Sequence, residues 1–191
     1  TIRPELQRAT ERALQEGLAQ YEQSAGRVEF RAPEANLSDA IRKLETNPKT
    51  DRRKPTWVTA LEQVRLPLYD VHWTPAVVVE KRNIQGTESI RVGLKDGRTL
   101  PLSTWGTRTR ARMGIYDVVY VRVFESAVRE TSGRPQQQQM GTRVELRVRP
   151  NVQGVAVVLE NRTGRILAMA GAFSYPLSQL NRATQALRQP G

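Results

Sequence analysis

The chain has 191 residues, enough for one large domain or two small ones, and a formal net charge of +11. No apolar run approaches the roughly 20 residues that a membrane-spanning helix needs. The absence of cysteine excludes disulfides and thiolate chemistry. The positive charge favours an anionic neighbour, such as nucleic acid, an anionic membrane surface or an acidic polymer. Arginine is spread over nearly the whole chain, so charge alone does not locate a site.

The N-terminal residues predict an amphipathic helix over residues 1–22. Pro4 suits a first helical turn, and Glu5 suits the positive end of the helix dipole. Apolar residues at helical spacing predict a single stripe that packs on a sheet, made of Leu6, Ala9, Ala13, Leu14, Leu18 and Tyr21. Two shorter helices are expected at residues 36–44 and 56–63.

Between residues 66 and 150 the pattern changes to strands. Alternation of apolar and polar residues predicts strands at 76–81, 89–94, 99–102, 117–124 and 142–149. Asp96-Gly97 is a hairpin-turn dipeptide. About five short strands, with a helical or irregular link near Trp105, are typical of a small closed barrel of the oligonucleotide/oligosaccharide-binding (OB) kind.

Residues 154–173 have a different pattern. Segments 155–159 and 166–170 are almost continuously apolar, which predicts strands buried on both faces of a layered α/β sheet. Gly164 is placed for a bulged hairpin turn between them. We therefore expect an α+β chain in which an OB-like barrel is inserted into an incomplete α/β domain, because one helix and two strands cannot cover each other.

Few residues suggest catalytic chemistry. His72 is the only histidine, and it is interpreted as a surface or packing residue. The chain has no zinc-ligand spacing, no Gly-x-Ser-x-Gly and no phosphate loop, so neither a metal nor another cofactor is predicted.

One alternative function is an OB-fold nucleic-acid-binding module. Aromatic residues near a run of arginines resemble a stacking platform for single strands, although at least half of these aromatics are expected in the core; the residues are Trp105, Tyr116, Tyr120, Phe124, Arg108, Arg110 and Arg112. An unrelated enzyme with its site in the barrel is a third hypothesis, which the lack of convergent polar residues disfavours.

Two stretches resemble the class A penicillin-binding proteins, which are bifunctional peptidoglycan synthases. These are residues 164–169 (GRILAM) and residues 181–191 (NRATQALRQPG). In that family a similar run leads directly into Ser-x-x-Lys, the motif of the transpeptidase nucleophile. Residues 1–17 resemble the segment that opens the transpeptidase region, with Arg3 where the family usually has Asp. The barrel resembles the domain inserted in 1A-type members.

The resemblance divides the chain into three parts. Residues 1–65 are expected to begin the transpeptidase region, residues 66–150 to form the OB-like domain, and residues 151–191 to form the first hairpin of the transpeptidase sheet and the lead-in to the nucleophile helix. The lead-in residues are Asn181, Arg182, Gln185, Gln189, Pro190 and Gly191. The nucleophile is expected just after Gly191, so whether this chain alone is an enzyme stays open. Ser174 and Ser178 are not substitutes, because no lysine lies three residues after either one.

The resemblance also implies a setting for the parent protein. It would act on peptidoglycan stem peptides and bind β-lactams at the periplasmic face of the cytoplasmic membrane, held by an N-terminal anchor outside this chain. The barrel would offer a surface to a regulatory protein and would not bind nucleic acid. This chain is then expected to serve as scaffold and interaction surface.

Overall fold

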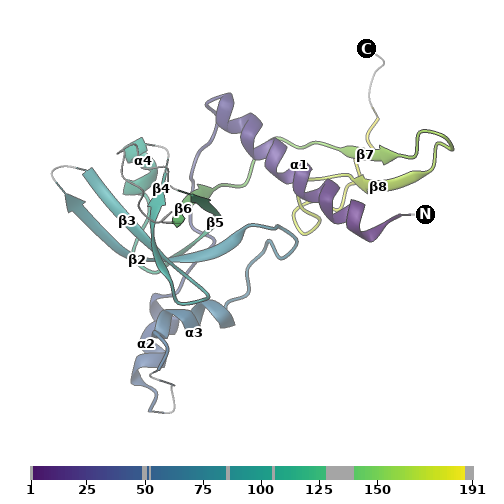
Figure 1. Cartoon of the computed structure of the whole chain (residues 1–191). Coiled ribbons are helices and arrows are strands. Elements are labelled where there is room, and N and C mark those ends of the chain that lie inside the picture. Colours follow the sequence, from purple (N-terminus) through teal and green to yellow (C-terminus); the bar gives the residue numbers. More distant parts are fainter. Residues whose placement is uncertain are drawn as a thin grey trace. The chain divides into compact units, whose positions relative to one another are not determined.

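The computed structural model describes residues 2–48, 51, 53–84, 87–104, 106–127 and 140–187 (Figure 1). The fold is mixed α+β, as predicted. The chain divides into two compact units: unit 1 comprises Thr1–Glu29, Leu66–His72 and Val148–Gly191, and unit 2 comprises Phe30–Arg65 and Trp73–Arg147. The structure groups residues 30–65 with the strands, whereas the sequence grouped them with the first helix; the three-part assignment to named domains stays a prediction. Among the described helices, none is long and apolar enough to cross a membrane.

Unit 2 is built on a closed five-stranded barrel. Its strands are β2 (Thr74–Ile84), β3 (Thr87–Leu94), β4 (Thr99–Ser103), β5 (Asp117–Ala127) and β6 (Met140–Arg147). The strand order is β5-β2-β3-β4-β6, and pairing of β6 with β5 closes the barrel. Neighbours are antiparallel except β4 and β6, which run parallel. The five predicted strands are therefore confirmed, with ends that differ by a few residues.

The barrel interior follows in part from the alternation in the sequence. Because successive side chains of a strand point to opposite faces, every second residue faces the interior. Val121 lies opposite Leu146, and Val123 opposite Val144. Residues 76–78 and 118–121 are buried consecutively, so β2 and β5 are covered on both faces there. The fully buried strand residues are all aliphatic: Ala76, Val77, Val78, Val92, Val118, Val119, Val121, Val144 and Leu146.

The predicted hairpin turn joins β3 and β4. Gly97 adopts a positive φ of 87°, which costs glycine little. The Asp96 carboxylate accepts hydrogen bonds from the Arg98 backbone N–H at 2.9 Å and from Arg98 Nε at 2.7 Å. The backbone hydrogen bond from Arg98 is the main cause that holds the pKa of Asp96 below its usual value.

Helices and a short strand accompany the barrel. They are β1 (Ala35–Asn36), α2 (Ser38–Thr46), α3 (Thr56–Gln63) and α4 (Gly106–Ala111), which confirms both predicted helices and the helical link near Trp105; Trp105 itself lies outside the described residues. Strand β1 pairs with β5. From α3, the Trp57 ring lies against β3 at Gly93, where a Cβ atom would meet ring carbons at 2.5 Å. Gly93 therefore allows α3 to approach the barrel closely.

We predict that Gly93→Ala destabilises the chain by about 1–3 kcal/mol, because the added methyl group displaces the Trp57 ring. The control is Gly17→Ala in a helix with open space around the new Cβ, which should stabilise by about 0.5–1 kcal/mol. Urea unfolding of the three proteins measures both changes. Equal stability of G93A and the wild type would contradict the close packing.

Unit 1 consists of α1 (Pro4–Ser24) and the hairpin of β7 (Ala156–Leu159) and β8 (Ile166–Ala170). Helix α1 packs on β8 and β7, as expected. The predicted apolar stripe is wrong in part: Ala9 and Ala13 are exposed and Tyr21 is 55% exposed. The fully buried α1 side chains are polar, namely Thr10, Gln15 and Glu22. The helix is held by hydrogen bonds to distant backbone, which hydrophobic periodicity cannot predict.

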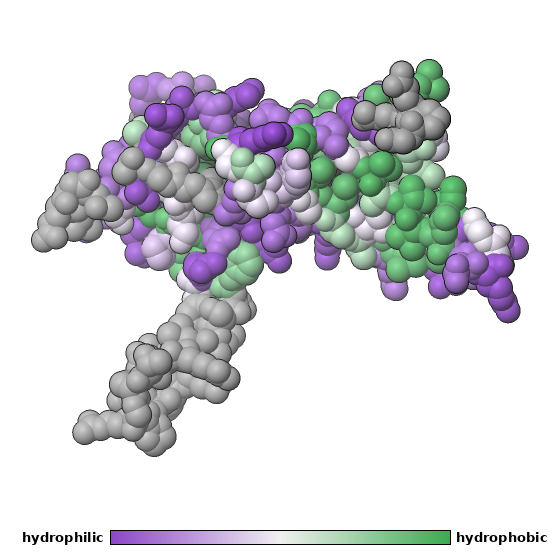
Figure 2. All heavy atoms as spheres, turned by 90° about the horizontal axis from the view of Figure 1, so that it is seen from above, coloured by the Kyte–Doolittle hydropathy of each residue, from purple (hydrophilic) through white to green (hydrophobic). Residues whose placement is uncertain are grey.

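The β7–β8 hairpin forms with the turn predicted, and Gly164 adopts a φ of 70°. Burial on both faces is wrong for this chain: Val157 is 44% exposed and Leu159 56% exposed. Helix α1 covers only one face of a two-stranded sheet, so alternate β7 side chains meet solvent. Figure 2 shows hydrophobic residues gathered on the surface of unit 1, on the right of the view.

Candidate functional site: the anchored lead-in segment

The first contact of the site lies along the outer edge of β8. The side-chain amide of Gln7 donates to the Met169 carbonyl at 2.8 Å, and Gln7 Oε1 accepts from the Met169 N–H at 2.9 Å. The Arg3 N–H donates to the Leu167 carbonyl at 2.8 Å. The N-terminal part of α1 thus satisfies backbone groups that an edge strand leaves unpaired.

Gln15 makes the second set of contacts. Its Nε2 donates to the carbonyls of Asp70 and Phe173, each at 3.2 Å. The Asp70 carboxylate accepts from Ser174 Oγ at 2.8 Å and from the Tyr175 N–H at 2.7 Å. Segment 66–72 and the loop after β8 are therefore bound to α1 and to each other.

Glu22 makes the third contact, where the chain re-enters unit 1. The side chain is 3% exposed, and its Oε1 accepts from the backbone N–H groups of Asn151 at 2.8 Å and Val152 at 2.9 Å. A buried carboxylate needs hydrogen-bond donors, and these two supply them.

His72 has a partner that the sequence did not indicate. Its Nδ1 lies 2.7 Å from Gln15 Oε1, and its Nε2 lies 3.0 Å from Glu16 Oε1. Glu16 is 56 residues away in the chain, so proximity in sequence did not indicate this contact; the interpretation of His72 as a packing residue agrees with it. His72 fastens segment 66–72 to α1.

The predicted lead-in residues form a tight turn after β8. The Asn181 carbonyl accepts from the N–H groups of Thr184 and Gln185, and Asn181 Oδ1 accepts from the Ala183 N–H at 3.0 Å. The Gln185 side chain reaches back to the Asn181 N–H at 2.9 Å. Asn181, Arg182 and Gln185 are thus brought together, whereas Gln189, Pro190 and Gly191 lie outside the described residues.

The turn is joined to the end of β8 at Gly171. The Arg182 N–H donates to the Gly171 carbonyl at 3.1 Å, and Asn181 Nδ2 contacts Met169 Sδ at 3.3 Å. A Cβ atom on Gly171 would lie 2.8 Å from Asn181 Cα. Only glycine permits this approach, which fixes the direction in which the chain leaves the turn.

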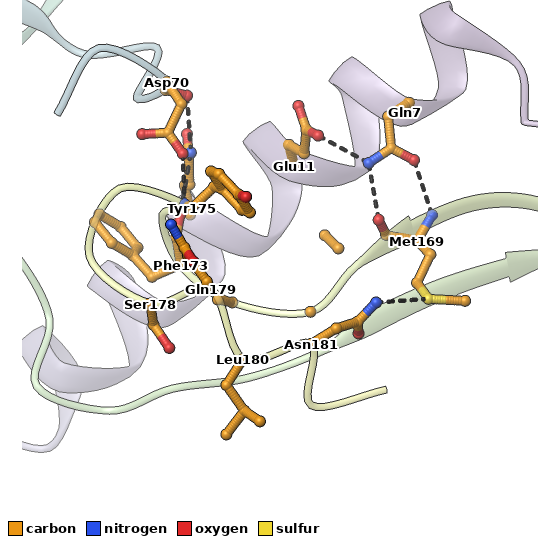
Figure 3. Close-up of a pocket in the computed structure, with 14 residues that line it drawn as sticks. Gln7, Glu11, Asp70, Met169, Phe173, Tyr175, Ser178, Gln179, Leu180 and Asn181 are labelled. Carbon is orange, nitrogen blue, oxygen red and sulfur yellow. Dashed lines mark hydrogen bonds between the residues drawn. The ribbon is translucent and has the colours of Figure 1, made fainter. Parts of the chain in front are cut away.

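A pocket of about 370 Å³ opens between these elements (Figure 3). Its wall comprises residues of α1, Asp70, the end of β8 and the following turn, including Gln7, Glu11, Tyr175, Ser178 and Asn181. The hydroxyl of Ser174 is bound to Asp70, and that of Ser178 accepts from Arg182 at 3.2 Å. The partners of these two serines are thus a carboxylate and a guanidinium group. The described residues hold no group of three or more side chains suited to a metal ion.

The aromatic residues of the nucleic-acid alternative are partly in the core, as expected. Tyr120 is buried, and its ring lies 6.4 Å from that of Trp73. Phe124 contacts Arg122, Arg143 and Arg147. The nucleic-acid alternative itself stays a prediction.

No family model matches the chain. Curated relatives do: penicillin-binding protein 1A of Pseudomonas aeruginosa is 28% identical over 100% of this chain and 21% of its own length. That of Rickettsia typhi is 25% identical over 98% of this chain and 20% of its own length. A 42-residue stretch, 22% of the chain, is 50% identical to the protein of Aquifex aeolicus, of which it covers 6%.

The structure comparison agrees. The crystal structure of penicillin-binding protein 1A from Haemophilus influenzae matches 98% of this chain and 24% of its own, with a TM-score of 0.57 at 20% identity. The resemblance seen in the sequence is thereby confirmed: the comparisons support a class A penicillin-binding protein fragment. It is similar throughout to the 1A-type members and spans about a fifth of the length of these curated relatives.

We predict that Glu22→Ala lowers the free energy of unfolding by about 2–3 kcal/mol, because two part-buried N–H groups lose a charged acceptor. Glu22→Gln keeps an acceptor oxygen and should cost about 1 kcal/mol. Urea unfolding measures both variants. A cost of E22A no larger than that of E22Q would contradict the role of this carboxylate.

Gly171→Ala should release the lead-in turn while leaving unit 2 folded, because the new methyl group collides with Asn181 backbone. The expected result is faster hydrogen exchange at the Arg182 N–H, measured by NMR, with barrel amides unchanged. Gly17→Ala is the matched control and should leave Arg182 exchange as in the wild type. Unchanged exchange at Arg182 in G171A would refute the anchoring.

Proposed function

We propose that this chain is part of a peptidoglycan synthase and that unit 1 positions the lead-in to a transpeptidase serine. The observation that carries the proposal is the turn at Asn181–Gln185, held on the end of β8 through Gly171. The family's nucleophile motif follows a sequence of this kind, so the serine would follow Gly191. Asn181, Arg182, Gln185, Gln189, Pro190 and Gly191 would then aim it.

We also propose that the two units are an OB-like barrel and an incomplete transpeptidase domain. The barrel proposal is supported by five strands, closure, and a helix between the third and fourth barrel strands. The second part is supported by the exposed apolar side chains of Val157 and Leu159 in β7 and of Val155 just before it. A further strand or helix of the same protein would cover this surface.

In the parent protein we infer a glycosyltransferase, a D,D-transpeptidase that acylates its serine with a stem peptide, and inhibition by β-lactams that imitate that peptide. A membrane anchor would hold it at the periplasmic face of the cytoplasmic membrane, and a regulatory protein would bind the barrel. The relatives' name, penicillin-binding protein 1A, supports this setting. This chain contributes scaffold and surface without the nucleophile.

A labelled β-lactam tests the proposal. We expect no covalent label on the 191-residue chain, because no described serine is paired with a lysine or histidine. We expect labelling of the gene product that continues beyond Gly191, with its adduct on a serine close after that residue. Label retained by the 191-residue chain after denaturation, or an adduct elsewhere in the longer protein, would refute the proposal.

A further inference from the structure

The pocket of about 370 Å³ in unit 1 carries charge of one sign (Figure 3). The carboxylates of Glu11 and Asp70 belong to its lining, and none of the described lining residues is a lysine, arginine or histidine. The chain as a whole has a net charge of +11, so the pocket is opposite in sign to the molecule that contains it. Its volume is in the range of pockets that hold small molecules.

The Glu11 carboxylate keeps one oxygen for a ligand. The side chain is half-buried on α1, and its Oε1 accepts from Gln7 Nε2 at 2.8 Å. The second oxygen, Oε2, accepts no hydrogen bond from the described residues, and no cation among them is paired with this carboxylate. An ionised carboxylate has about four acceptor sites. Glu11 can therefore take a donor that comes from outside the chain.

The Asp70 carboxylate is held by neutral donors only. Its oxygens accept from Ser174 Oγ and from the Tyr175 N–H, and no described cation is paired with it. The Arg182 guanidinium, close to the pocket, donates to Ser178 Oγ and to a backbone carbonyl instead. Neither acidic charge of the pocket is thus neutralised by the described part of the chain.

Tyr175 and the aliphatic lining supply the remaining features of the pocket. Tyr175 is 62% exposed and belongs to the lining, and an aromatic face attracts a cation in solution. Met169, Ala172 and Leu180 form apolar wall (Figure 3), against which an alkyl chain loses contact with water. Carboxylates, an aromatic ring and an aliphatic wall together suit a ligand with a positive head and an apolar body.

We propose that this pocket binds a small aliphatic amine in its ammonium form. Glu11 is the principal acceptor, because its Oε2 is unused by the chain, and a hydrogen bond between two charged groups is stronger than one between neutral groups. Asp70 adds attraction through its charge, and the alkyl chain of the ligand packs on Met169 and Leu180. The inference concerns unit 1 alone and does not depend on the transpeptidase role.

The test is an NMR titration of the whole chain with pentylamine at about 150 mM salt, where distant charges are screened. We expect saturable shifts of the Gly171 and Tyr175 amides. Glu11→Gln keeps an acceptor for Gln7 and removes the charge, so it should weaken binding about fivefold or more. Glu5→Gln removes the same charge at an exposed position of α1 outside the pocket and should change affinity less than about twofold.

Pentanol has the same alkyl chain without the positive charge, so it separates recognition of the ammonium group from burial of the chain. We expect its affinity to be lower than that of pentylamine by about fivefold or more. The absence of saturable shifts with pentylamine, or equal affinity for pentanol, would overturn the proposal. An E11Q protein that binds pentylamine as tightly as E5Q does would overturn it as well. Spectra of both variants without ligand verify that unit 1 is folded.

Discussion

Unit 1 depends on hydrogen bonds from one helix to backbone far along the chain. Gln7, Gln15 and Glu22 follow one another along α1 and bind the edge of β8, the loop after it and the re-entry segment. The partners are 129 to 162 residues away in sequence. Buried backbone groups that find no partner destabilise a fold by several times the gain of an ordinary contact. The side-chain amides of Gln7 and Gln15 and the carboxylate of Glu22 therefore select the distant segments that pack against α1.

This arrangement explains how a two-stranded sheet can order the loop and turn that follow β8. Two strands have too little apolar surface to fix a following loop by burial alone. Gln15 and Asp70 restrain the loop at residues 173–175, and Gly171 lets Asn181 lie directly on the strand end. The turn at residues 181–185 is thus held by polar contacts, which specify geometry more narrowly than apolar packing does.

The sequence predicted what depends on local periodicity. The barrel strands were found because Val119, Val121 and Val123 alternate with polar or aromatic residues, and the hairpin turns were found from Gly97 and Gly164. The role of α1 was missed, because a stripe of Leu and Ala gave a stronger signal than three polar residues whose partners are backbone atoms. The contact of His72 with Glu16 was missed because the two residues are 56 positions apart in the chain. Asn181, Arg182 and Gln185 were identified only through the family motif, and no residue property of their own would have singled them out.

The length of chain between α1 and its partners bears on how the protein is made. Helix α1 is synthesised first, and Met169 and Phe173, which bind it, come near the end. At about 5–20 residues per second, a ribosome needs about 7–30 seconds for the intervening chain. The barrel residues 73–147 are synthesised within that interval. Unit 1 therefore cannot be completed before its last partners are released, and until then Gln15 and Glu22 of α1 lack them.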